Sequence, residues 1–566
     1  MVSRKKTILF LFLMLAITSA SFAQKVLPLK PYDGTAASGL IAQIKADTLA
    51  NKGILADRIY ELTPGAIYLC TEIFNVAAKY TMNIRGAAGG ARPIIYLYPT
   101  GTGATPQRPP GNLFVLLGGN LRMSNLAISG YFEPVDTNFN NVQGGLVNTT
   151  AAGSSIYVDN CVLSNINGQH LRTGSAAKTV KVTNSIFANM GALSTSNFGA
   201  GKGLDLREVA IDSLILVNNT FVNYQDRVVR HYNFSNPLAG TGNIGYTLID
   251  HNSFVNGMGF HGLLSLGNVG KQVIIRNNLF MDAFASGEDS TDATRSVEWG
   301  NTGEKYPNGR YRMMWIFTAP NDTTKWTVKN NFYSISSAGQ TFFDAHKKEP
   351  ITEGKQLSAH ISKRLGADST KAFTKVSLTM TNIPKLMTNM MAWYLDPNGG
   401  NKTKNTPTSK WQWPRDDMDR KPIKYYTDEM KADYPTTSAA YTGAEKSFPA
   451  GDLNWFPTRK TAWIAAGGTD VQKTSNEIPS EFSLEQNYPN PFNPSTNISF
   501  SIPKEGFVRL NVYNVLGQQV ASLVNENMKA GKYNYAFDAS RLSTGVYFYS
   551  LQTTDYSLTK KMLLVK

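Results

Sequence analysis

Charged side chains are scarce in this chain of 566 residues, and cysteine is nearly absent. Asp, Glu, Lys and Arg make up 17% of the residues, against about 25% in an average soluble domain. A coiled coil or helical bundle needs many Glu, Lys and Ala at helical spacing, so the composition excludes both. Cys70 and Cys161 are too few for a disulfide scaffold and match no metal-binding spacing. We expect both thiols in the core, although an oxidising compartment would also permit a bridge between them.

Long apolar runs are missing after the first 23 residues. Residues 4–6 are basic, residues 8–17 are apolar, and residues 21–23 form a small-residue cleavage site, which is the arrangement of a signal peptide. The apolar run is shorter than the roughly 18 residues that span a bilayer. We therefore assign residues 1–23 to a signal peptide and expect no integral membrane segment after its cleavage. The formal charge then becomes (56 − 3) − 41 = +12, so the expected product is an exported, soluble, basic monomer.

Asparagine and aromatic residues are abundant instead. Of 48 Asn, 29 fall between residues 101 and 350, so any explanation of the fold must account for that region first. The 28 Phe, 26 Tyr and 8 Trp supply enough apolar area for a large core, which excludes a disordered chain.

One phrase recurs seven times in and around this Asn-rich region: an alternating apolar stretch, an Asn, two further residues and a large apolar residue. The copies span residues 121–128, 156–163, 180–187, 215–221, 248–254, 274–280 and 326–333. Alternation with period two predicts strands, and a second short apolar run before most copies predicts at least two strands per repeat. Stacked turns of this kind would bury a continuous apolar column and pair their strands in parallel.

The aligned position three residues before the large apolar residue is nearly always Asn. It holds Asn125, Asn160, Asn184, Asn218, His251, Asn277 and Asn330. At about 4.8 Å between strands, identical Asn side chains can hydrogen-bond along a stack. We therefore predict an Asn ladder in this column, with a structural rather than a catalytic role.

These turns resemble the right-handed parallel β-helices of the pectate-lyase-like superfamily over residues 60–340. Residues 248–254 are similar to the Asp-His-containing segment of pectate lyases, but no Arg-x-Pro-x-x-Arg segment, which carries that family's catalytic arginine, follows them. The resemblance implies an all-β fold with a parallel β-helix (solenoid) over residues 24–340. Many members of the superfamily are polysaccharide lyases or hydrolases, and others are adhesins.

The C-terminal end carries a second set of motifs. Residues 487–496 read Asn-Tyr-Pro-Asn-Pro-Phe-Asn-Pro-Ser-Thr, short alternating strands with Gly and Pro turns follow, and the chain closes on Lys-Lys-Met-Leu-Leu-Val-Lys. This pattern predicts a small immunoglobulin-like β-sandwich over residues 480–566. It closely resembles the type A C-terminal sorting domain of the type IX secretion system. The resemblance implies a translocon partner, removal of the domain, and a secreted or outer-membrane surface-attached product. An ordinary carbohydrate-binding module is the alternative.

Residues 341–479 show no repeat, and we predict a cap and decoration for the end of the β-helix together with a linker. The alternative for this region is carbohydrate stacking on three of its tryptophans, Trp411, Trp413 and Trp455.

Charged residues gather between residues 202 and 231, where neighbouring turns would bring them together. Cleavage of a uronic-acid polymer by β-elimination needs a cation for the carboxylate, a base for the C5 proton and an acid for the leaving oxygen. In the pectate-lyase-like superfamily, which these turns resemble, arginine or lysine can be the base, and calcium held by Asp or Glu can bind the substrate carboxylate. The predicted catalytic residues are Arg230 or Arg207, as base or carboxylate clamp, and His231 as an alternative acid–base residue. The calcium candidates are Asp205, Glu208 and Asp226, and the substrate-binding candidates are Arg172, Lys202 and Arg227.

A lyase acting on acidic polysaccharide is the function that we predict. A glycoside hydrolase would need two carboxylates about 5 to 9.5 Å apart, for which Asp205 and Asp226 are the candidates. A non-catalytic glycan-binding protein or adhesin needs only the groove, the charge and the aromatic residues. Alternatively, the charged residues only form salt bridges at the edge of the groove and bind no ligand. Nucleic acid is not expected as a partner despite a pI of about 9.4, because the charge is scattered and the protein is exported.

Overall fold

A computed structural model describes residues 25–565 except for 51–57, 100–110, 131–142, 192–200, 232–241, 298, 346–352, 397–417, 465, 467–471, 476–478, 480, 529 and 540–541. The predicted signal peptide lies outside the described residues, as do Trp411 and Trp413.

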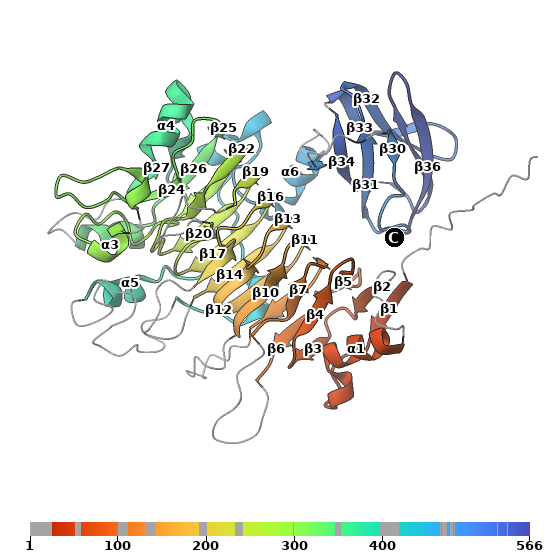
Figure 1. Cartoon of the computed structure of the whole chain (residues 1–566), viewed down its shortest axis with the longest axis horizontal. Helices are drawn as coiled ribbons and strands as arrows, with labels where there is room; N and C mark the ends of the chain where they lie inside the picture. Colours follow the sequence, from red (N-terminus) through yellow and green to blue (C-terminus); the bar gives the residue numbers. More distant parts are fainter. Residues whose placement is uncertain are drawn as a thin grey trace, which may run out of the picture.

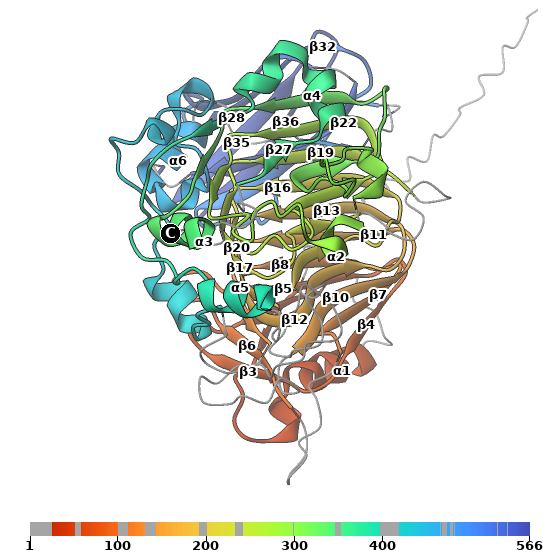
Figure 2. The same cartoon turned by 90° about the vertical axis from the view of Figure 1, so that its left-hand side faces the viewer.

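Three ladders of parallel strands run through residues 25–375 (Figures 1 and 2). The first face consists of β1 (Lys25–Leu29), β2 (Arg58–Leu62), β5 (Thr81–Gly86), β8 (Asn120–Ser124), β11 (Ser154–Asp159), β13 (Ala177–Thr183), β16 (Ile211–Val217), β19 (Ile244–Asp250), β22 (Val269–Arg276) and β25 (Lys325–Lys329). The second face consists of β3 (Ile67–Cys70), β6 (Ile94–Leu97), β9 (Ala127–Ser129), the first half of β12 (Val162–Thr173), β14 (Ile186–Met190), β17 (Thr220–Tyr224), β20 (Ser253–Gly257), β23 (Leu279–Met281), β26 (Asn331–Ser334) and β28 (Phe373–Lys375).

The third face consists of β4 (Phe74–Ala77), β7 (Phe114–Leu117), β10 (Gln143–Ala151), the second half of β12, β15 (Lys202–Asp205), β18 (Val229–Arg230), β21 (Leu264–Gly267), β24 (Met314–Thr318) and β27 (Lys355–Leu357). From β2 to β27 the chain visits the three faces in the same order in every turn. The chain is mostly β with long parallel sheets, which is consistent with the predicted all-β class and fits a parallel β-helix.

The core runs through all the turns without interruption. Phe187, Phe221, Phe254 and Phe280 stand in register on the second face, with successive ring centroids 5.2, 5.4 and 4.7 Å apart. All four rings are fully buried, and each is the large apolar residue that closes one copy of the repeat. Because no single turn could bury its own ring, the stack couples the stability of each turn to that of its neighbours.

The predicted Asn column forms a corner rather than a ladder. Its seven members have left-handed backbones, with φ between 51° and 57°. Asn tolerates this conformation better than most residues, so it lets the chain turn from the first face to the second. One side-chain bond joins two members of the column, from Asn160 to Asn125 (3.3 Å). Asn184 and Asn277 donate instead to Asp159 and Asp250 (2.8 and 2.9 Å).

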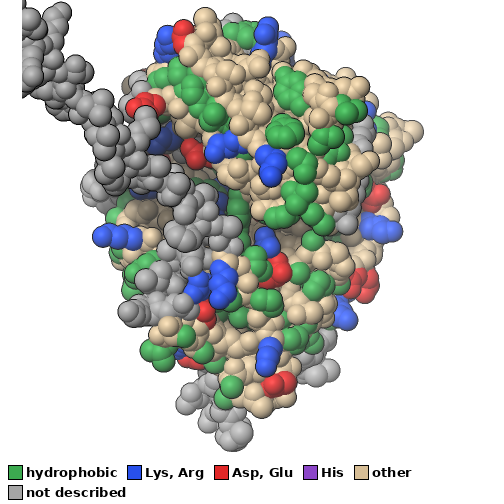
Figure 3. All heavy atoms as spheres, turned by 90° about the vertical axis from the view of Figure 1, so that its right-hand side faces the viewer, with side chains coloured by type: hydrophobic (Ala, Val, Ile, Leu, Met, Phe, Trp, Pro, Cys, Tyr) green, Lys and Arg blue, Asp and Glu red, His purple; other side chains and the backbone are tan. Residues whose placement is uncertain are grey.

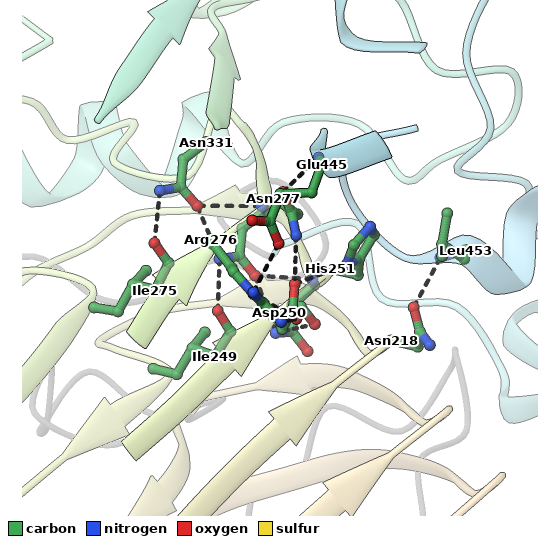
Figure 4. Close-up of polar contacts among 12 residues, drawn as sticks. Asn218, Ile249, Asp250, His251, Ile275, Arg276, Asn277, Asn331, Glu445 and Leu453 are labelled. Carbon is green, nitrogen blue, oxygen red and sulfur yellow. Dashed lines mark hydrogen bonds and ion pairs between the residues drawn. The ribbon is translucent and has the colours of Figure 1, made fainter. Parts of the chain in front are cut away.

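The ladder lies one residue further along the chain. Asn219, Asn252, Asn278 and Asn331 are buried, and each Nδ2 donates to the next Oδ1 at 2.9, 3.0 and 2.9 Å. Asn331 also donates to the carbonyl of Ile275 (3.0 Å; Figure 4). The prediction of an Asn ladder is therefore correct in kind and wrong by one position.

A second left-handed corner follows five residues after the first. It consists of Asn165, Asn189, Asn223, Asn256 and Asp282, with φ between 48° and 59°. Asn223 donates to Asn189 (3.1 Å), and Asn189 donates to Asn165 (2.7 Å). This column lies at the turn from the second face to the third, and the repeat pattern does not predict it.

Short helices and turns cover both ends of the ladders. At the start, η1 (Ala36–Ser38) leads into α1 (Leu40–Ala50), which buries Leu40, Ile41 and Ile44 against the core. At the far end lie α3 (Ser337–Ala345), α4 (Ala359–Leu365) and η4 (Gly366–Lys371). Because β27 and β28 pair in parallel with β24 and β26, the ladders continue past residue 340 to Lys375.

Residues 376–396 and 418–464 pack along the outside of the second face. They contain α5 (Thr388–Leu395), η5 (Tyr425–Glu429), η6 (Ala439–Tyr441), η7 (Glu445–Ser447), η8 (Leu453–Trp455) and α6 (Pro457–Trp463). Their apolar side chains share a core with the outward residues Val222 and Val255. Arg276 links the two layers, since it contacts Asp250 at 2.9 Å and Glu445 at 2.7 Å (Figure 4).

A buried carboxylate lies between this outer layer and β17. Asp452 accepts hydrogen bonds from Thr220 Oγ1 (2.8 Å) and from the backbone N–H of Asn454 (2.9 Å). The indole N–H of Trp455 donates to the same Thr220 hydroxyl (2.8 Å), so this tryptophan is held by the fold. Burial raises the pKa of Asp452 from 3.8 to about 7.

Raising the pH is expected to weaken the docking of residues 418–464. Because the pKa of Asp452 is higher in the folded state, its contribution to stability is complete below its unfolded pKa of 3.8 and is lost as pH rises through about 7. Hydrogen exchange of residues 418–464 should therefore accelerate between pH 5 and 8 beyond the intrinsic rate increase. Asp452→Asn should remove this extra dependence and Asp428→Asn, at an exposed position, should keep it. An unchanged pH slope in Asp452→Asn would contradict the assignment.

Two four-stranded antiparallel sheets form the C-terminal end (Figure 1). One contains β29 (Gln472–Ser475), β30 (Ser483–Leu484), β31 (Ser495–Ile502) and β34 (Gly531–Asp538), and the other β32 (Gly506–Tyr513), β33 (Gln519–Met528), β35 (Gly545–Gln552) and β36 (Ser557–Leu564). Ile498 and Phe500 of the first sheet share a core with Leu510 and Val512 of the second. The expected small β-sandwich is present, and its immunoglobulin-like topology stays a prediction.

Candidate functional site

The third face carries a column of polar residues that occupy the same register position on successive strands. Arg172, Asp205, Arg230 and Ser265 are register partners on β12, β15, β18 and β21. In each strand the preceding residue is apolar and buried in the core. Because side chains alternate along a strand, the column points away from the core.

Arg230 is the centre of an outer cluster, which we define as Arg172, Asp205, Arg207, Glu208 and Arg230. Its guanidinium lies 2.7 Å from Asp205 Oδ1 and 2.6 Å from Glu208 Oε1. Arg172 Nε approaches Asp205 Oδ2 to 3.9 Å from the turn before. The side chain of Arg230 is 11% exposed and that of Arg172 is 36% exposed, so the cluster opens toward Arg172.

The chain leaves β15 through two consecutive left-handed residues. Arg207 has φ 48° and Glu208 has φ 59°. Such a conformation costs about 1 to 3 kcal/mol for a residue other than glycine, so other contacts must hold it. The turn brings the Glu208 carboxylate back to Arg230 and leaves Arg207 exposed. Within the described part of the chain, the Arg207 guanidinium has no ion-pair partner.

The pKa values of Arg230 and Glu208 are both raised, but for different reasons. Burial opposes the charge on Arg230, but Asp205 and Glu208 outweigh it and raise the pKa of Arg230. Burial raises the pKa of Glu208 and Asp205 adds to this effect, while Arg230 and Arg207 oppose it. Arg230 is therefore a fixed cation, and the raised pKa of Glu208 makes this carboxylate a stronger base than an ordinary glutamate.

An inner cluster lies beneath this surface and consists of Lys202, Asp226, Arg227 and His261. Asp226 is fully buried, and it contacts Lys202 Nζ at 3.0 Å, Arg227 Nε at 3.2 Å and His261 Nδ1 at 2.7 Å. Burial alone would raise the pKa of Asp226, but Arg227, Lys202 and His261 lower it well below 3.8. Lys202 and Arg227, which sequence analysis assigned to substrate binding, thus face Asp226 in the interior.

His231 also lies inside the fold rather than in the outer cluster. The residue is 1% exposed, and its Nε2 lies 2.8 Å from the carbonyl oxygen of Val209. Burial lowers the pKa of His231 to about 4, so its imidazole is neutral at neutral pH. His231 is therefore a buried, neutral side chain that bonds the backbone next to Glu208.

The predicted calcium ligands do not fit a calcium site in this arrangement. Asp205 and Glu208 share Arg230, while Asp226 is enclosed by two basic side chains and a histidine. Over the described residues, no group of three or more His, Cys, Asp or Glu side chains is placed to hold a metal ion. Calcium would have to displace these cations, so we derive no step through it.

His261 belongs to the inner cluster and Ser265 to the column of polar residues, and the sequence pattern predicts neither. His261 precedes β21 in a turn that the repeat pattern did not cover, 35 residues after its partner Asp226. Ser265 accepts a bond from Arg227 Nη1 (3.2 Å) and continues the outer column, but it is fully buried. An alignment of β21 with β18 would have placed Ser265 in the same column as Arg230.

No helix in the part of the chain that the structure describes is both long enough and apolar enough to cross a bilayer.

Comparison with known families identifies the C-terminal end. Residues 486–566 match the family model of the secretion system C-terminal sorting domain. No curated protein matches the chain. The match confirms the predicted type IX sorting domain and, with it, engagement of a secretion system. The protein is secreted or attached to the outer-membrane surface.

Proposed function

We propose that this exported protein binds acidic polysaccharide on its third face and cleaves the polymer by β-elimination. The proposal includes a right-handed β-helix of the pectate-lyase-like type, which agrees with the strong right-handed preference of parallel crossovers. The observation that carries it is the outer cluster, where Arg172, Arg207 and Arg230 lie around Glu208, whose side chain is 11% exposed. An exported protein meets anionic polysaccharide readily, and such polymers present a carboxylate on each uronic acid.

The substrate carboxylate is bound by the arginines that lack a close ion pair with a carboxylate of the protein. Arg230 has both its carboxylate partners within 2.7 Å, so it organises the cluster rather than binding a ligand. Arg207 is exposed and without an ion-pair partner among the described residues. The ion pair of Arg172 with Asp205 is long, at 3.9 Å, and therefore weak. Two guanidinium groups can grip one carboxylate through charge-assisted hydrogen bonds. This contact withdraws charge and makes the neighbouring C5–H bond more acidic.

The chemical step then needs one base. Glu208 takes the C5 proton, and the electron pair of the C5–H bond forms the C4=C5 double bond. The C4–O bond breaks, and the leaving oxygen takes a proton from water. Glu208 returns its proton to the resulting hydroxide, so no net proton is consumed or released. The raised pKa of Glu208 suits this role, because a base works best near the ambient pH.

Glu208→Gln is expected to lower kcat about 100-fold or more, since general-base contributions are of that size. Arg207→Ala should mainly raise KM, because it removes a contact to the bound carboxylate. The assay follows the ultraviolet absorbance of the unsaturated product from pectate, alginate and glycosaminoglycans, with calcium and with a chelator. Arg122→Ala is the matched control, since Arg122 is exposed on the first face and stacks on Tyr157. No absorbance with any acidic polymer would refute the lyase.

A non-catalytic glycan-binding protein is the second candidate, and the complete pairing of Arg230 favours it. In that case retention on an acidic glycan column would depend on Arg207 and Arg172 but not on Glu208. The paired-carboxylate hydrolase gains no support, because Asp226 is fully buried and enclosed by the inner cluster.

A further inference from the structure

An open depression lies on the segment between β23 and β24, outside the outer cluster. Its volume is about 590 Å³, and it is lined by Thr291, Ser296, Asn308, Gly309, Arg310 and Tyr311. This volume falls within the roughly 300 to 1,000 Å³ of small-molecule sites. The lining combines hydroxyl groups, an amide, one guanidinium and one aromatic ring. These are the groups that hydrogen-bond the hydroxyls of a sugar and pack against its ring.

Hydrogen bonds hold the walls of the depression in place. A tight turn links Tyr306 to Gly309, whose N–H donates to the Tyr306 carbonyl (2.9 Å), and Gly309 has the positive φ (85°) that this turn requires. The N–H of Tyr311 donates to Ser296 Oγ (3.0 Å), which joins the turn to α2 (Ala293–Val297). Arg295 anchors α2 through bonds to the carbonyls of Phe260 (2.7 Å) and Gly287 (3.0 Å). The cavity is therefore preformed.

Arg310 differs from its basic neighbours on the same segment. Arg312 pairs with Glu288 at 2.7 Å, and Arg295 is buried on backbone carbonyls. Among the described residues, Arg310 has no ion pair, although its side chain is only partly exposed and lines the depression. Arg207 and Arg310 both lack an ion pair with a carboxylate among the described residues, and they lie at two separate places on the molecule. A free guanidinium beside hydroxyls favours a ligand that carries both a carboxylate and hydroxyl groups.

We propose that this depression binds a single uronic-acid residue, with Arg310 holding its carboxylate and Tyr311 packing against the sugar ring. The proposal rests on the specificity for acidic polysaccharide proposed above and adds a second contact point for the polymer. Lys305 Nζ lies 5.0 Å from the centroid of the Tyr311 ring, which adds positive charge beside the same site.

The test uses the mature chain with Arg207→Gln as background, which removes the exposed guanidinium of the outer cluster. Saturation-transfer NMR titrations with D-galacturonate, and with D-galactose as the neutral counterpart, give the two dissociation constants. Galacturonate should bind more tightly than galactose. Arg310→Gln should weaken galacturonate about tenfold and leave galactose unchanged, while Tyr311→Ala should weaken both sugars and Tyr311→Phe neither.

Equal binding of galacturonate with and without Arg310→Gln would overturn the proposal, and so would the absence of binding to the Arg207→Gln protein. Both results leave the polymer assay with the outer cluster intact as an independent test of the proposed function. Loss of polymer cleavage in Glu208→Gln combined with unchanged galacturonate binding in Arg310→Gln would mean that the depression is not a sugar site although the function holds.

Discussion

Replacing Asn252 by Ala is expected to lower the free energy of unfolding of the parallel strands by about 3 to 5 kcal/mol. Asn252 occupies the middle of the ladder and is fully buried. Its Oδ1 accepts bonds from the N–H and the Nδ2 of Asn219 (3.1 and 2.9 Å), and its Nδ2 donates to the Leu216 carbonyl (2.9 Å) and to Asn278 (3.0 Å). Truncation leaves several buried polar groups without partners, and each costs about 1 to 3 kcal/mol.

Asn330→Gly is the matched control for this variant. Asn330 lies in the corner column with φ 53° and is partly exposed, and glycine adopts that conformation without strain. We expect a change within about 1 kcal/mol, measured as the urea midpoint of the β-sheet circular dichroism signal. A loss at Asn252 no larger than that at Asn330 would mean that the ladder contributes little to stability.

The strand repeat was readable from the sequence because it obeys one steric rule. Each turn must bury a large apolar residue at the same place, so Phe187, Phe221, Phe254 and Phe280 recur in the alternating pattern and stack as that pattern implies. The strands of the C-terminal sandwich follow the same logic. Alternating apolar and polar residues indicate which face of a strand is buried, and the buried face determines how the strand pairs with its neighbours.

The position of the Asn ladder could not be predicted from the sequence, because adjacent asparagines have different structural roles. Asn218 and Asn219 follow one another, as do Asn277 and Asn278. The first of each pair takes the left-handed backbone, and the second points inward and joins the ladder. Both tasks favour Asn, so composition alone does not separate them, and only the backbone dihedral angle does.

The site could be predicted only where it follows the strand register. Arg172, Asp205 and Arg230 come together because they occupy one column on three successive turns. Asp226 and Arg227 precede β18 in an irregular segment, and there the direction of a side chain depends on what later parts of the chain place beside it. His261 arrives from the next turn and encloses Asp226, which converts an apparent surface carboxylate into a buried one.

Asp226→Ala is expected to destabilise the parallel strands by about 3 to 5 kcal/mol, because it leaves Lys202 and Arg227 buried without their carboxylate. Lys202 belongs to β15, the strand that carries Asp205, so the outer cluster should lose its alignment at the same time. The expected signs are a lower urea midpoint and weaker retention on acidic polysaccharide. Asp212→Asn, on the exposed side of β16, should change neither.

The pH dependence of this variant provides a second criterion. Since the folded pKa of Asp226 lies well below 3.8, its contribution to stability is complete above the unfolded pKa and is lost as pH falls through the folded pKa. The difference in unfolding free energy between wild type and Asp226→Ala should therefore stay constant from neutral pH down to about pH 4 and shrink only in stronger acid. A difference that vanished already near pH 6 would show that the carboxylate is not held ionised by Lys202 and Arg227.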